Sequence, residues 1–122
     1  MHIEQFRDLC LAKKGVTEHF PFNKTTLVFK VMDKMFALTD LLNWEQGLPK
    51  VNLKCNPEKA LELREQFEGI SPGFHMNKKH WNTVIINVAD VSDVLVKQLI
   101  NHSYDLVITG LPKKSQKELQ NL

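Results

Sequence analysis

Two short runs of β-forming residues lie at 27–31 and 34–38, and only Met32 and Asp33 separate them. Branched and aromatic side chains of this kind favour strands over helices. Strands joined by so short a turn pair side by side in opposite directions, so the two runs are predicted to form a β-hairpin. The sheet of this protein is therefore expected to be antiparallel.

The segment 50–55 is predicted to be a further strand with two different faces. Its apolar residues are Val51, Leu53 and Cys55, which alternate with Lys50, Asn52 and Lys54. Because successive side chains of a strand point to opposite faces, one face would be apolar and the other polar and partly basic. Another strand is predicted over 81–88, a short extended piece over 20–22, and a loop over 41–49.

Helical spacing of apolar residues predicts a first helix over 2–14. A second helix is predicted to begin at Asn56 and Pro57 and to end near Phe67. The asparagine side chain can cap free N–H groups, and proline at the first helical position loses no needed donor. Gly69 is expected to end this helix in a left-handed conformation.

A third helix is predicted to begin after Ser92, a good N-cap residue, and to carry a long apolar stripe. Residues 102–105, with the sequence HSYD, fall inside this helix. A structural role is therefore expected for them rather than a catalytic one. In particular, His102 and Tyr104 are predicted to bond across to the sheet or to the 73–82 loop.

A short helix from Lys113 is expected to close the chain, so helices and strands together predict a two-layer α+β sandwich. In this fold the helices pack on one face of an antiparallel sheet. A chain of 122 residues, 43% of them hydrophobic, is expected to form one domain over residues 1–122. Cys10 and Cys55 fall on apolar positions, so both are expected to be buried thiols rather than a disulfide.

Polar and charged residues near the start, such as Glu4 and Arg7, argue against a signal peptide, and no apolar run is long enough to cross a bilayer. We therefore expect a cytoplasmic monomer without membrane contact. The formal net charge of +2 is only mildly basic. Nucleic-acid binding would have to follow from the distribution of charge rather than from its total.

Several strings in the sequence resemble those of the MmcQ/YjbR family of small bacterial proteins. They are GFHMNKKHWNTV at 73–84, VNLKC at 51–55, KMFAL at 34–38, HSYDLV at 102–107, LPKK at 111–114 and FPF at 20–22. The resemblance implies a CyaY-like or frataxin-like α+β fold, and it implies DNA binding. Frataxin-like iron binding is not expected, because Glu4 and Asp8 are the only acids of the first predicted helix.

The segment 75–82 is the most unusual stretch, and no acidic residue occurs between Gly69 and Ala89. Lysines can pair with phosphates, asparagines can bond to phosphates or base edges, and a tryptophan can stack on a base. We therefore predict a non-enzymatic DNA-binding protein that makes mainly phosphate contacts. The candidate residues are Lys50, Lys54, His75, Asn77, Lys78, Lys79, His80, Trp81, Asn82, Lys113 and Lys114.

Three alternatives stay open for these residues. In the first, 75–82 is a turn entering a strand, with Trp81 in the core and the lysines solvated. In the second, the protein is an interaction module in which Trp44 and the Trp81 region present a partner surface. In the third, it binds a small ligand near His75, His80 and His102.

Catalytic signatures are absent from the sequence. It has neither a glycine-rich phosphate loop nor a Cys-x-x-Cys pair, and His75 and His80 lack further ligands for zinc. Cys10 falls on an apolar helix face, where a reactive thiolate is disfavoured. No enzymatic activity, metal or cofactor is therefore predicted.

Overall fold

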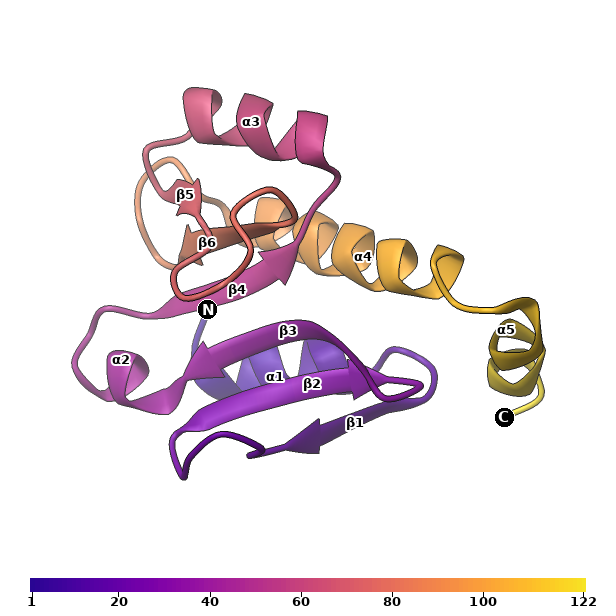
Figure 1. Cartoon of the computed structure of the whole chain (residues 1–122). Helices are drawn as coiled ribbons and strands as arrows, with labels where there is room; N and C mark the ends of the chain where they lie inside the picture. Colours follow the sequence, from indigo (N-terminus) through magenta and orange to yellow (C-terminus); the bar gives the residue numbers. More distant parts are fainter.

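A computed structural model describes all residues from 1 to 122. Figure 1 shows its helices and strands. In chain order they are α1 (Ile3–Leu11), β1 (Val16–His19), β2 (Thr26–Val31), β3 (Lys34–Asp40), α2 (Leu41–Glu45), β4 (Lys50–Lys54), α3 (Pro57–Gln66), β5 (Ile70–Pro72), β6 (Trp81–Ile85), α4 (Asp93–Thr109) and α5 (Lys113–Gln120).

The six strands form one sheet in the order β1-β2-β3-β4-β6-β5, and every neighbouring pair is antiparallel. The predicted hairpin is confirmed as β2 and β3. Met32 and Asp33 between them have φ of 48° and 64°. Two successive positive φ angles match the right-handed twist of paired strands, although glycine and asparagine usually supply them. The Met32 side chain packs against the core, which offsets part of the strain.

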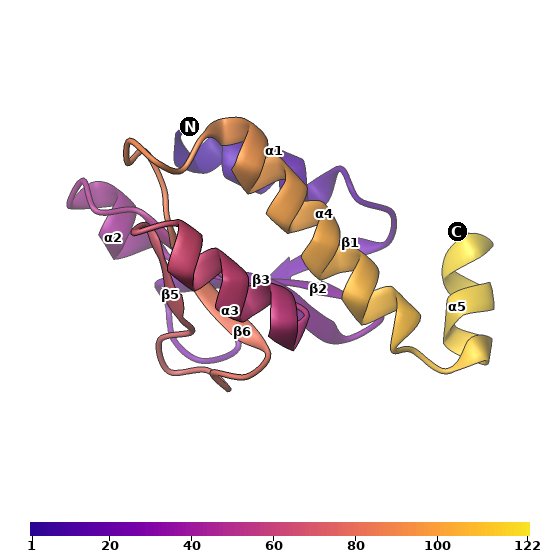
Figure 2. The same ribbon diagram turned by 90° about the horizontal axis from the view of Figure 1, so that it is seen from above.

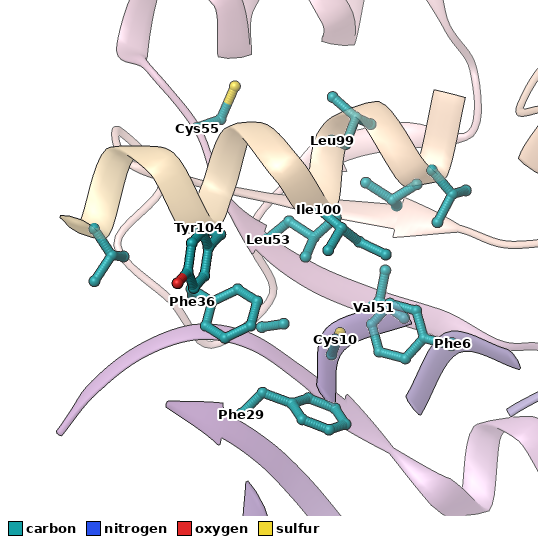
Figure 3. Close-up of a cluster of buried hydrophobic side chains, with 14 of the residues drawn as sticks. Phe6, Cys10, Phe29, Phe36, Val51, Leu53, Cys55, Leu99, Ile100 and Tyr104 are labelled. Carbon is teal, nitrogen blue, oxygen red and sulfur yellow. The ribbon is translucent and has the colours of Figure 1, made fainter. Parts of the chain in front are cut away.

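Helices α1, α3 and α4 cover one face of the sheet, so the predicted two-layer α+β sandwich is confirmed (Figure 2). The core between the layers is rich in aromatic residues (Figure 3). The rings of Phe6 and Phe29 meet edge to face at 6.0 Å, and those of Phe36 and Tyr104 at 5.6 Å. Such edge-to-face pairs stabilise a core beyond their buried area.

The middle of α4 is hydrogen-bonded to the sheet through Ser103, which is fully buried. Its hydroxyl donates to the carbonyl of Phe36 at 2.5 Å and accepts from the N–H of Lys54 at 2.9 Å. The hydroxyl of Tyr104 instead donates to the carbonyl of Lys14, at 2.6 Å, and Nε2 of His102 accepts from the N–H of Asn56 at 3.1 Å. Within the segment HSYD at 102–105, the hydrogen bonds to the sheet thus come from Ser103. The prediction that His102 and Tyr104 bond to the sheet or to the 73–82 loop was wrong.

Both strong helix starts of the sequence are confirmed. Asn56 caps α3 by accepting from the N–H groups of Glu58 and Lys59, and Ser92 caps α4. The role predicted for Gly69 was wrong, since its φ is not positive. A Cβ there would approach the side chains of residues 88 and 91 to within 3 Å, so glycine is required by close packing.

Three short elements differ from the sequence prediction: β1, β5 and α2. Trp44 lies in α2, within the segment predicted to be a loop. Its indole N–H donates to the hydroxyl of Thr39 at 2.8 Å, and its ring packs 6.1 Å from that of Phe6. Trp44 therefore anchors α2 to the core, although its side chain is only half-buried.

Cys10 and Cys55 are buried and unpaired, as expected. Burial raises the pKa of both thiols, because a thiolate loses its hydration inside the protein. None of the five helices is both long and apolar enough to span a bilayer.

Candidate functional site

The sheet face opposite the helices carries the alternate residues of each strand. In the ladder, Leu38 pairs with Asn52 and Asn52 with Thr83, so these three side chains point to the same face. A small apolar cluster of Val28, Leu38 and Trp81 also lies there. We call this the helix-free face; it is turned toward the viewer in Figure 1.

A cavity of about 480 Å³ opens on the helix-free face. Its floor includes Leu38 and Thr83, which are buried, and its edge includes Lys50, which is exposed. The β1–β2 loop borders it on one side, and the β5–β6 loop borders it on the other. The remaining lining residues are Phe22, Asn23, Thr26, Thr39, Asp40, Asn43, Asn52, Phe74, His75 and Met76.

A chain of hydrogen bonds holds the β5–β6 loop to this face. The backbone N–H of Phe74 donates to the hydroxyl of Thr83 at 2.9 Å, and this hydroxyl donates to Oδ1 of Asn52 at 2.5 Å. The amide of Asn52 then donates back to the carbonyl of Phe74 at 3.2 Å. Because all three partners are bonded to one another, the first residues of the loop have a fixed position above the cavity.

Arg64 of α3 holds the other end of the loop. Its Nε donates to Oδ1 of Asn82 at 2.7 Å, and its guanidinium also donates to the carbonyls of Trp81 and Lys78. Asn82 is buried on the helix-covered face, where its amide reaches the carbonyl of Ala60 at 3.4 Å. The arginine and the asparagine together fasten the loop to α3.

Aromatic rings are exposed on both sides of the cavity. Phe22 of the β1–β2 loop is 64% exposed, and Phe74 of the β5–β6 loop is 67% exposed. The ring of Phe74 lies 3.9 Å from that of His75, measured between centroids. His75 has a φ of 59°, an uncommon backbone conformation that turns the loop at this point. Large apolar rings in water are unusual enough to suggest a binding surface.

Lys50 is the single lysine of the lining, and it is exposed and has no carboxylate partner. The only side-chain ion pair of the chain joins Arg7 of α1 to Glu18 of β1. Asp40 is the single carboxylate of the lining, and its Oδ1 accepts from the N–H of Leu42 at the start of α2.

The predicted site residues separate into three groups in the structure. Lys50 and His75 line the cavity, and Lys54 points to the same face. Trp81 and Asn82 are buried and do not line the cavity, so the structure places them outside this candidate site. Asn77, Lys78, Lys79 and His80 lie in the β5–β6 loop, whereas Lys113 and Lys114 lie on α5, far from that loop in both views (Figures 1 and 2).

Asn77 shapes the β5–β6 loop from within. Its side-chain oxygen accepts from the N–H of Lys79 at 3.0 Å, and its carbonyl accepts from the N–H of Trp81 at 3.0 Å. Lys78 also bonds within the loop, since its Nζ donates to the carbonyl of Gly73 at 3.0 Å. The interpretation of this segment as a turn entering a strand therefore describes Asn77 and Trp81 well. Lys78 and Lys79 are both exposed and border α3, outside the lining of the cavity.

The histidines, cysteines and acids of the chain do not gather into a metal site. No group of three or more His, Cys, Asp or Glu side chains could hold a metal ion. Of the three histidines that we had considered together, only His75 lines the cavity, while His102 is bonded to the backbone before α3. Burial lowers the pKa of His102, which favours its neutral form as a hydrogen-bond acceptor.

Comparison with known proteins connects this geometry to a family. The family model described as YjbR matches residues 11–106, which include the sheet and most of α4. The chain belongs to the YjbR family. Its YjbR-family relatives include the uncharacterized protein YbdF of Escherichia coli O157:H7, 41% identical over 96% of this chain and 93% of the relative. The uncharacterized protein YjbR of Escherichia coli K12 is 31% identical over the full length of both chains.

Solved structures confirm the YjbR-family fold. The Deinococcus radiodurans protein DR2400, whose domain is described as DUF419, is 39% identical, with a TM-score of 0.86 over 98% of this chain and 88% of that protein. A Pseudomonas syringae protein is 32% identical, with a TM-score of 0.72 over 87% of this chain and 98% of that protein. These likenesses establish the fold, and the function must be argued from the site.

Proposed function

We propose that this YjbR-family domain binds nucleic acid on its helix-free face and catalyses no reaction. The observation that carries the proposal is the arrangement around the cavity: Lys50, which has no carboxylate partner, lines it together with two exposed aromatic rings, and Lys54 points to the same face. Lysines pair with phosphates, and aromatic rings stack on bases, so nucleic acid satisfies both kinds of group at once. DNA is the partner that we test.

Phosphate contacts would supply most of the affinity. Lys50 and Lys54 come from β4 and point to the helix-free face together with Asn52. Each phosphate that a lysine neutralises releases a bound counterion, so affinity should fall steeply as salt rises. Since few lysines gather here, binding is expected to be weak at physiological salt and measurable at low salt.

The test is a salt titration of binding to fluorescein-labelled DNA of random sequence, followed by fluorescence anisotropy. We expect the logarithm of the binding constant to fall linearly with the logarithm of the salt concentration. Absence of binding to both single strands and duplexes at low salt would refute the proposed function.

A matched pair of charge reversals identifies the face that binds. The first variant carries Lys50→Glu and Lys54→Glu, and the second carries Lys113→Glu and Lys114→Glu on α5. None of the four lysines is buried, and both variants change the net charge by the same amount. We expect the first variant to lose most of its affinity and the second to keep it. Equal losses would indicate a non-specific effect of net charge.

The cavity supports a second candidate function, the binding of a free small ligand. Its volume of about 480 Å³ lies within the range of small-molecule sites, about 300–1,000 Å³. In this case a small aromatic or anionic compound would raise the melting temperature of the protein, whereas oligonucleotides would not. A thermal-shift screen that includes both kinds of compound separates the two functions.

A further inference from the structure

We infer that the cavity on the helix-free face receives one unpaired base, so that the domain binds single strands in preference to duplexes. This inference rests on the proposed function and specifies which form of nucleic acid the site accepts. Three features of the cavity support this inference. Its lining contains both polar and apolar groups, the exposed rings of Phe22 and Phe74 lie at its mouth, and Lys50 lies at its edge.

The lining of the cavity suits a neutral polar ring better than a phosphate. Asp40 has one carboxylate oxygen engaged at the start of α2, and its other oxygen would repel an anion but can accept from a base N–H. The oxygen of Asn23 accepts from the N–H groups of Thr25 and Thr26, at 2.9 and 2.7 Å, which leaves its amide as a donor. A base edge carries donors and acceptors together, as this lining does.

The apolar part of the lining fits the flat faces of a base. Leu38 forms the floor together with the methyl-bearing side chain of Thr83, and Met76 borders them. Phe22 and Phe74 stand at the mouth, on loops over different strands, with their rings in solvent. A base that entered between them would cover rings that water now surrounds, and base–aromatic stacking is tolerant of sequence.

A paired base cannot use this site. In a duplex each base is stacked on both faces and bonded along its edge, so it would have to leave the helix at a cost of a few kcal/mol. An unpaired base enters without this cost. Lys50 lies at the edge of the cavity, where it can pair with the phosphate attached to the bound nucleotide.

The test compares a labelled ten-nucleotide strand of random sequence with duplexes of the same length at one low salt concentration. We expect the single strand to bind at least tenfold more tightly. Two variants, Phe22→Ala and Phe74→Ala, are each expected to weaken single-strand binding about fivefold or more, which corresponds to about 1 kcal/mol of lost stacking. Because both side chains are largely exposed, neither variant should impair folding.

Phe20→Ala is the matched control. Phe20 belongs to the same loop as Phe22 and is 49% exposed, but it does not line the cavity. We expect this variant to bind like the unmodified protein. A loss equal to that of Phe22→Ala would contradict a site inside the cavity.

A second kind of variant fills the cavity without removing an aromatic ring. Thr26 lines the cavity at the start of β2 and is half-buried, so Thr26→Phe should occupy the space of the base. We expect it to abolish the preference for single strands while the melting temperature stays close to that of the parent. Equal, salt-sensitive binding of single strands and duplexes by the parent would refute the inference and leave the proposed function standing, whereas no binding of either would refute both.

Discussion

Replacing Ser103 by alanine is expected to destabilise the protein more than any other removal of a single hydroxyl. Ser103 is fully buried in α4, and its hydroxyl bonds to two backbone groups of the sheet. The β3–β4 ladder ends where Ala37 pairs with Leu53, so the carbonyl of Phe36 and the N–H of Lys54 lie just beyond it. The serine hydroxyl takes the place of the missing strand partner for both groups.

The magnitude follows from the burial of the two backbone groups. A buried donor or acceptor left without a partner costs about 1–3 kcal/mol. Phe36 is fully buried, so its carbonyl would bear this cost in full. Lys54 is half-buried, and water can reach its N–H in part. We therefore expect Ser103→Ala to lower the free energy of unfolding by about 2–4 kcal/mol, a large part of the stability of a typical domain.

Urea denaturation followed by tryptophan fluorescence measures this effect. For an m value of about 2 kcal/mol per molar urea, the midpoint should fall by about 1–2 M while m itself stays constant. The control is Ser71→Ala in β5, because Ser71 is exposed. Surface changes of this kind usually stay within about 0.5 kcal/mol of the parent.

A loss below about 1 kcal/mol for Ser103→Ala would refute this reasoning, since the two backbone groups would then have found other partners. A large loss would instead explain the HSYD string of the sequence as a fastening of α4 to the sheet.

Three further predictions concern titratable groups. Cys10 and Cys55 should not react with a thiol reagent in the native protein and should react fully in urea, because burial raises the pKa of both thiols. Burial lowers the pKa of His102 below its ordinary 6.5. The free energy of unfolding should therefore be highest above pH 6.5 and decline as the pH falls below 6.5, because the unfolded chain binds the proton first. His102→Gln should flatten this dependence in unfolding curves measured at several pH values. The hydrogen bond to Arg7 lowers the pKa of Glu18 from 4.5. A small stabilisation should therefore be complete above pH 4.5 and be lost as pH falls through the lowered pKa, with Glu18→Gln as the comparison in the same curves.

The fold could be predicted from the sequence wherever a local cause determined the structure. The hairpin at Met32 and Asp33 followed from the two-residue spacing between β-forming runs, and Asn56 with Pro57 marked the start of α3. These signals depend only on neighbouring residues. They were sufficient to give the fold class and the direction of the sheet.

The missed elements depend on contacts with distant residues. Strand β5 has three residues and exists because it pairs with β6, although Pro72 ends it. Helix α2 has five residues and is held by Trp44, whose indole bonds to Thr39. Short segments of this kind have too little intrinsic preference to be identified before their partners are known.

The candidate site could be predicted only in part. Lys50 was identified because strand alternation placed it on a polar face, and His75 because its segment is unusually polar. Phe22 was placed in a short extended piece, and both Phe22 and Phe74 fell in family strings, but neither was named as a site residue, since an exposed ring cannot be distinguished from a buried one in the sequence. The proline before Phe22 was the available signal, because it favours a surface loop.

The acid-free segment divides between the two faces of the sheet, and its two buried polar residues hold the β5–β6 loop from opposite sides. Asn82 points to the helix-covered face and is bonded to Arg64, whereas Thr83 points to the helix-free face and is bonded to Asn52. At 82 a carboxylate could pair with Arg64, but at 83 it would be buried opposite the side-chain oxygen of Asn52. The absence of an acid at 83 thus has a structural cause, so it does not by itself indicate an anion site. The indication comes instead from Lys50 and from the exposed rings, which the fold does not need and which solvent surrounds.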